Sequence, residues 1–107
     1  MENISEALKI DFIPREKQHS EYDWADLSYD NQPVGKVRCK IENYTITIFS
    51  INVYPEWKGQ GFGTKFVEYC KKNFRKVVAD LVRPTAITFW EKVGFSDNLD
   101  GTWVFKR

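Results

Sequence analysis

The chain has 107 residues, of which 42% are hydrophobic and 16% aromatic, so it is long enough to bury one core, and we expect residues 1–107 to form one domain. Lys and Arg total 16 against 15 Asp and Glu, and the net charge of +1 predicts neither nucleic acid nor a membrane as a partner. Cys39 and Cys70 are too few for a disulfide scaffold, so we expect both thiols to be reduced and packed. Met1–Ala7 lacks the apolar region of a signal peptide, and no apolar run approaches the roughly 18–20 residues of a membrane span, which predicts a cytoplasmic protein.

The first half of the chain alternates apolar and polar residues, which is typical of antiparallel strands with one exposed face. The predicted strands cover Leu8–Ile13, Glu21–Tyr29, Val34–Ile41 and Tyr44–Val53, with a polar connection over 15–20 and turns over 30–33 and 42–43. The alternation is clearest in the third strand, where three apolar residues face one way and three basic residues the other: Val37, Cys39 and Ile41 against Lys36, Arg38 and Lys40.

The fourth predicted strand, Tyr44–Val53, changes its apolar phase half-way along. Its first half has Tyr44, Ile46 and Ile48 in phase, and its second half has Phe49, Ile51 and Val53 in phase. A shift of one residue would turn the second half to the wrong face of the sheet unless a β-bulge absorbs an extra residue, and bulges often lie beside functional sites. A strand buried on both faces is the alternative, because phase carries no meaning there.

The second half of the chain carries two helical patterns. Apolar residues recur every four positions from Gly61 to about Arg75, and a second apolar helical pattern follows Pro84 and ends at Gly94, which fits the left-handed position after a helix. A short strand is predicted over Val77–Val82, and a hairpin over Phe95–Phe105 turns at Asp100-Gly101. The predicted fold class is therefore α+β, with a mixed, mostly antiparallel twisted sheet and two helices.

The segment Lys58-Gly59-Gln60-Gly61-Phe62-Gly63-Thr64 lies between the fourth predicted strand and the first predicted helix. Glycines at alternate positions let the backbone turn sharply and approach a ligand, and the helix directs unpaired N–H groups and a positive dipole end toward the same place. A phosphate or pyrophosphate is the natural ligand of such a site. The spacing matches neither the dinucleotide-binding nor the Walker fingerprint, and a tight connection without a ligand is the alternative.

Two motifs in this order resemble the GNAT acetyltransferase superfamily over roughly residues 22–105. Lys58–Thr64 resembles the family's acyl-CoA loop, Arg/Gln-x-x-Gly-x-Gly/Ala, with Gly61 and Gly63 as its glycines. Ala86–Phe95 resembles the second signature, an Ala, an aromatic pair and then Gly-Phe. The resemblance implies a GNAT-like fold, a single acyl-CoA N-acyltransferase-like domain over 1–107, and acetyl-CoA as co-substrate without a metal.

The resemblance also implies which residues contact acetyl-CoA. Main-chain N–H groups of Gln60–Thr64 would bind the pyrophosphate, Lys58 would add a charge, and the main chain at Ile51 and Val53 would pair with the pantetheine arm. The expected cofactor-binding residues are Ile51, Val53, Lys58, Gly59, Gln60, Gly61, Phe62, Gly63, Thr64 and Trp90. Trp90 would line the thioester pocket, or it would simply be part of the core of an amphipathic helix.

The chain departs from the family pattern in three places. Only residues 14–20 are available where the family has two helices, so the acceptor side should be open or closed by another subunit, in a homodimer or with a protein partner. Trp90 replaces a Tyr that often acts as general acid, and an indole N–H does not give up its proton at neutral pH. Arg83 replaces a frequent Asn. These departures leave the catalytic residues unassigned.

The other reactive side chains favour structural roles. His19 lies in a polar connector, Glu56 follows the exposed strand exit, and Cys70 lies on the apolar stripe of a helix. The resemblance implies acetyl transfer from acetyl-CoA to a primary amine, of a small molecule or a protein, by direct attack. The alternative is a non-catalytic acyl-CoA sensor that acts through a protein partner.

Overall fold

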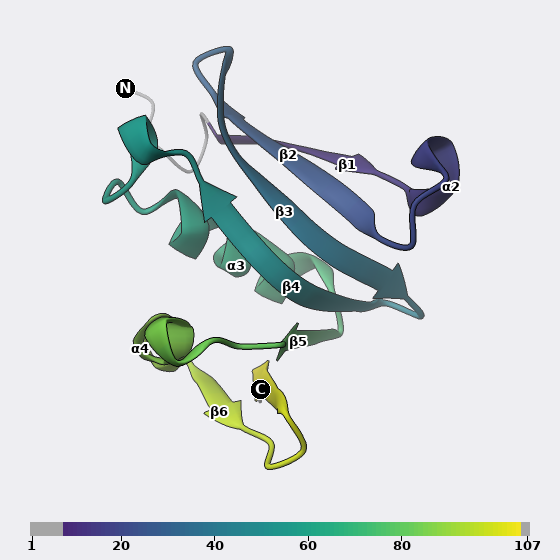
Figure 1. Ribbon diagram of the computed structural model, residues 1–107, viewed down its shortest axis with the longest axis vertical. Helices are drawn as coiled ribbons and strands as arrows, with labels where there is room; N and C mark the ends of the chain where they lie inside the picture. Colours follow the sequence, from purple (N-terminus) through teal and green to yellow (C-terminus); the bar gives the residue numbers. More distant parts are fainter. Residues whose placement is uncertain (1–7, 106–107) are drawn as a thin grey trace.

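The computed structural model describes residues 8–105, in which seven strands form one mixed sheet in the order β1-β2-β3-β4-β5-β7-β6 (Figure 1). Every neighbouring pair is antiparallel except β4 and β5, which are parallel. The elements are β1 (Leu8–Ile13), α2 (Arg15–Gln18), β2 (Asp23–Tyr29), β3 (Gln32–Glu42), β4 (Thr45–Val53), η1 (Pro55–Trp57), α3 (Phe62–Asn73), β5 (Lys76–Asp80), η2 (Pro84–Ala86), α4 (Ile87–Lys92), β6 (Phe95–Asp97) and β7 (Thr102–Phe105). The predicted α+β class is confirmed.

The predicted elements are present, and their ends differ by a few residues. Helix α3 ends at Asn73 rather than near Arg75, because Phe74 takes an extended conformation that leads into β5. Strand β5 ends at Asp80, and Leu81 has a left-handed φ of 56° that ends the predicted strand early. Gly94 has the predicted left-handed φ, 92°, after α4.

The connection between β1 and β2 contains the four-residue helix α2. It is too short to hold two longer helices. Asp23, at the start of β2, anchors it with a buried carboxylate that is 6% exposed. Oδ1 of Asp23 accepts a hydrogen bond from the Arg15 N–H at 2.7 Å, and Oδ2 accepts one from the Ile41 N–H at 2.8 Å. A buried carboxylate satisfied by main-chain donors ties this corner to β3.

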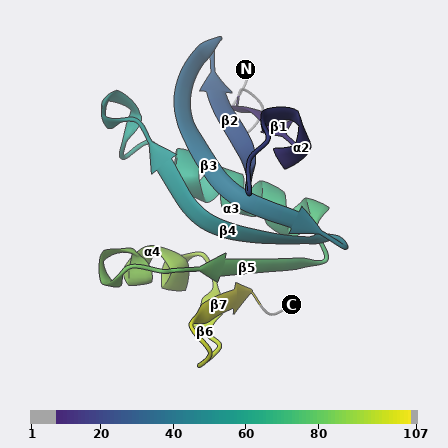
Figure 2. The same cartoon turned by 45° about the vertical axis from the view of Figure 1, so that its right-hand side comes forward.

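Helix α3 packs against one face of the sheet, and α4 lies beside it. The buried side chains of α3 are Phe62, Phe66, Val67 and Cys70, and they join inward residues of β2 to β5 in one core. In Figures 1 and 2, α3 lies behind β3 and β4, and the opposite face of these two strands carries no helix of the described residues in either view. The outward residues of β3, Lys36, Arg38 and Lys40, belong to this open face.

Both cysteines are buried free thiols within this core. Burial raises the pKa of Cys39 to about 12 and also raises the pKa of the Cys70 thiol. Because the thiolate is the reactive species, we expect neither cysteine of the native protein to react with an aromatic disulfide reagent at pH 8. Both should react once urea unfolds the chain, as absorbance of the released thiol will report. Rapid reaction of native Cys70 would contradict its role as a packing residue.

Candidate functional site

The predicted β-bulge lies in β4 at Phe49. On strand β3, Cys39 pairs with Ile48 and Arg38 pairs with Ser50, so Phe49 is the extra residue. The bulge keeps both halves of β4 on one face, since Ile48 is buried while Ile51 and Val53 also pack against the core. The alternative of a strand buried on both faces is wrong, because Ser50 is exposed.

The bulge also marks the point where β4 and β5 separate. Their parallel pairing runs from Thr45 and Lys76 to Ile48 and Ala79 and stops there. Beyond it, the Tyr54 N–H donates to the Val34 carbonyl of β3 at 2.8 Å. Polar main-chain groups of an antiparallel strand alternate in direction, so those of Ile51 and Val53 face away from β3, toward the gap that β5 leaves.

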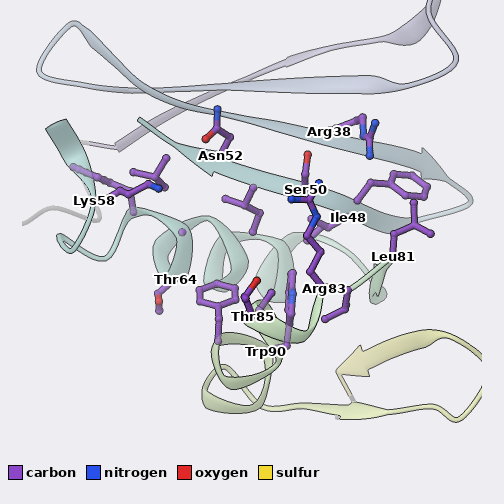
Figure 3. Close-up of a pocket in the computed structure, with 18 of the residues that line it drawn as sticks. Arg38, Ile48, Ser50, Asn52, Lys58, Thr64, Leu81, Arg83, Thr85 and Trp90 are labelled. Carbon is purple, nitrogen blue, oxygen red and sulfur yellow. The ribbon is translucent and has the colours of Figure 1, made fainter. Parts of the chain in front are cut away.

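A cleft of about 970 Å³ fills this gap (Figure 3). Its walls are the second half of β4, the glycine loop, the first turn of α3, the exit of β5 and the start of α4. Nine of the ten residues expected at a cofactor site line it: Ile51, Val53, Lys58, Gly59, Gly61, Phe62, Gly63, Thr64 and Trp90. Gln60 is exposed and does not line the cleft.

The glycine loop places the start of α3 beside the cleft, and this helix start has no side-chain cap. Gly61 is the residue before the helix and has a left-handed φ of 86°, a conformation that favours glycine. The first helical hydrogen bond runs from the Lys65 N–H to the Gly61 carbonyl at 2.9 Å, which leaves the N–H groups of the first turn without a helical acceptor. No side chain of residues 8–105 caps them, and the first turn of α3 has no acidic residue. The positive end of the helix dipole is therefore uncompensated here.

Trp90 belongs to the core and to the cleft at once. Trp90 is 6% exposed, and the centre of its ring lies 5.1 Å from the centre of the Phe89 ring and 4.8 Å from that of the Phe95 ring. Figure 3 shows Trp90 below the cleft, on the wall opposite β4. The two interpretations of this residue are thus compatible, since the indole packs against the core and presents one side to the opening.

Several lining residues were not singled out as binding residues from the sequence, above all Arg38, Ser50 and Asp80. The signal that could have found the first two is the bulge, because it sets Ser50 beside the opening and Arg38 opposite Ser50. Arg83, noted only as a departure, also lines the cleft. His19 at the end of α2, Glu56 in η1 and buried Cys70 do not line it.

A sequence model of the Acetyltransferase (GNAT) family matches residues 2–95. The chain belongs to this family. No protein with a curated description matches it in sequence. Membership of this family supports acetyl transfer as the general chemistry of the chain.

Solved structures share the fold at low identity. The chain is similar to PaiA N-acetyltransferase from Thermoplasma acidophilum, in complex with coenzyme A, at a TM-score of 0.59 and 19% identity over 87% of this chain and 65% of that one. The chain is also similar to AtaT complexed with acetyl-methionyl-tRNA, at a TM-score of 0.68 and 11% identity over 92% of this chain and 94% of that one. It is similar as well to the ribosomal-protein-S18-alanine N-acetyltransferase from Escherichia coli, at a TM-score of 0.60 and 16% identity over 95% of this chain and 82% of that one. The chain thus spans less than two thirds of PaiA.

Residues 8–105 show neither a metal site nor a membrane-spanning helix. No group of three or more His, Cys, Asp or Glu side chains gathers there in a way that could hold a metal ion. None of the described helices has the length and apolar character that crossing a membrane requires.

Proposed function

We propose that this chain transfers an acetyl group from acetyl-CoA to a primary amine by direct attack. One observation carries the proposal: the main-chain edge at Ile51 and Val53 and the uncapped start of α3 open into the same cleft. The first can pair with the amide groups of pantetheine as an added strand does, and the second suits a pyrophosphate. The coenzyme A bound to PaiA supports the same ligand here.

In this arrangement the ligand would lie along the cleft from the glycine loop to the bulge. The N–H groups of the first turn of α3 and the Lys58 side chain would bind the pyrophosphate at one end of the cleft (Figure 3). The thioester would lie at the other end, beside the bulge and Trp90. A main-chain N–H near Val53 would stabilise the negative charge that develops on the carbonyl oxygen.

The reaction needs a neutral amine, because a lysine-like amine has a pKa of about 10.4 and is almost fully protonated at pH 7. The free nitrogen attacks the carbonyl carbon, the carbon–sulfur bond breaks, coenzyme A leaves as a thiolate, and the extra proton on nitrogen passes to water. Asp80 is the single carboxylate lining the cleft in the described residues, and its Oδ1 already accepts the Leu81 N–H at 2.8 Å. Ser50 and Tyr54 lie close in sequence to the bulge and would order a water there. The thiolate can leave without an acid, since thiol pKa values are about 8.5.

Turnover should therefore rise about tenfold per pH unit from pH 6 to 8, in proportion to the free-amine fraction. Continuous detection of released thiol, with and without amine, measures it. Asp80→Asn is the control, and it should leave the slope unchanged. If turnover instead reached a plateau below pH 8, and if this plateau changed in the Asp80→Asn protein, Asp80 would be identified as a base. That result would contradict proton loss to solvent.

A non-catalytic acyl-CoA sensor is the second candidate, and Trp90 in place of the usual Tyr favours it. The single turn of α2 also leaves the acceptor side open, so a second copy or a protein partner would have to cover it. A sensor would bind acetyl-CoA tightly and release no thiol in response to any amine at any pH. That result, over a broad panel of amines and peptides, would replace the enzyme proposal.

A further inference from the structure

The end of the cleft beside the bulge carries two arginines from facing walls. Arg38 comes from β3, and Arg83 comes from the segment that follows β5. In Figure 3 the Arg83 side chain extends across the cleft toward β4, while Lys58 and Thr64 lie at the other end. The two arginines are therefore separate from the loop that suits the pyrophosphate.

The Arg38 guanidinium is held by aromatic rings rather than by a carboxylate. Its central carbon lies 4.8 Å from the centre of the Tyr22 ring and 5.9 Å from that of Phe49, the bulge residue. Its Nε is buried and has no hydrogen-bond partner among the described residues. Stacking fixes the plane of the group but does not neutralise its charge, and an unpaired buried donor is costly.

No carboxylate of residues 8–105 forms an ion pair with either arginine within 4.0 Å. Asp80 is the one acidic residue that lines the cleft, against the cations Arg38, Lys58 and Arg83. The row of basic residues continues on β3, where the Lys40 Nζ lies 5.5 Å from the centre of the Tyr22 ring. The face of β3 from which an acceptor would enter thus carries a row of basic side chains, of which only Lys36 pairs with a described carboxylate, that of Asp26 at 4.0 Å, and no described helix covers it.

We infer that the acceptor amine belongs to a small molecule that also carries an anionic group, a carboxylate or a phosphate, and that Arg38 and Arg83 bind this group. The inference rests on the proposed function, because it names the substrate class of the same site. A planar guanidinium binds either anion through two parallel hydrogen bonds, and an anion between the two arginines would balance the charge that the protein leaves unpaired. Two cations near the thioester also disfavour a bound ammonium group, so a polyamine without an acid should be a poor acceptor.

Matched acceptors test the inference. β-Alanine is compared with β-alaninamide, and O-phosphoethanolamine with ethanolamine, each rate being expressed per concentration of free amine. In the wild-type chain, kcat/KM from thiol release should be higher for the anionic member of each pair by about tenfold or more. The two pairs also separate a carboxylate from a phosphate as the preferred anion.

Arg83→Gln and Arg38→Gln should each bring this ratio close to one, with the Kd of acetyl-CoA unchanged. Arg83 is exposed, so its variant should fold even if Arg38→Gln does not. Lys17→Gln removes the same charge from α2, which does not line the cleft, and should keep the wild-type ratio. A ratio near one in the wild-type protein, with clear thiol release, would overturn the anionic acceptor and leave the proposed function standing.

A binding measurement decides the matter if no amine releases thiol, an outcome that would instead overturn the proposed function. β-Alanine should then raise the melting temperature of the wild-type chain saturated with coenzyme A and should not raise that of Arg83→Gln. Equal responses of the two proteins would refute the anion site. A uridine oligonucleotide and inorganic phosphate can each be tested as inhibitors of β-alanine binding to the chain saturated with coenzyme A. Stronger inhibition by the oligonucleotide would assign the basic row to nucleic acid and overturn the small acceptor.

Discussion

Gly61→Val should abolish the rise in melting temperature that acetyl-CoA gives to the wild-type chain. At about 100 times its Kd, a ligand that binds only the folded state adds about 2.7 kcal/mol to the free energy of unfolding. Gly61 lines the cleft, and a Cβ atom built there would meet no protein atom within 4 Å. The branched side chain would therefore occupy the space in which we place the pyrophosphate. Thermal unfolding with and without acetyl-CoA measures the effect.

The backbone at Gly61 complicates this test, because any other residue there is strained. Its φ is 86°, and a left-handed conformation costs a residue with a side chain roughly 1–2 kcal/mol. Gly101, in the β6–β7 turn, has a φ of 94° and equally open surroundings, and it does not line the cleft. Gly101→Val should thus lose similar intrinsic stability and keep the full response to acetyl-CoA. If folded Gly61→Val keeps that response as well, the glycine loop is not the pyrophosphate site.

The sequence predicted the part of the site that depends on local pattern. The phase change between Ile48 and Phe49 located the bulge, because period-2 alternation is a property of neighbouring residues. The glycine loop was recognisable for the same reason, since its turn and the helix start that follows occupy consecutive positions. The roles of these residues in binding remain predictions, and the two variants above test them.

The arginine end of the cleft could not be predicted in this way. Arg38 meets Tyr22 and Phe49 only because three strands pair in a particular register, with Trp24, Arg38 and Ser50 side by side. From sequence alone Arg38 was one of three basic residues on an exposed strand face. Its stacked guanidinium and its buried Nε, which has no partner among the described residues, are consequences of tertiary packing, which alternation along one strand does not encode.

The short connection between β1 and β2 links the fold to the open acceptor side. Asp23 completes the corner with two main-chain hydrogen bonds, so β1 can join the sheet through only one helical turn. The cost is that the outward face of β3 is left without a helical cover among the described residues. The basic side chains of this face remain hydrated there, which is where we propose that an anionic acceptor binds.

Trp90→Ala should lower the free energy of unfolding by about 3–5 kcal/mol, the usual cost of removing a large buried aromatic side chain. The ring contacts Phe89 and Phe95 and is 6% exposed, so its loss leaves a cavity in the core. Chemical denaturation measures this loss. Trp103 is a tryptophan of β7 that packs against the core without lining the cleft, so Trp103→Ala is the control for instability alone.

Trp90→Tyr distinguishes the second role of this residue. Tyrosine keeps most of the buried ring and adds a phenol O–H, which can protonate the departing thiolate where an indole N–H cannot. We expect the folded variant to turn over acceptor as fast as the wild-type chain or faster, while Trp103→Tyr leaves the rate unchanged. The kinetics should be read at a temperature at which both variants are fully folded. A slower Trp90→Tyr protein with unchanged acetyl-CoA affinity would show that the indole itself positions the thioester, and the missing tyrosine would then not limit the reaction.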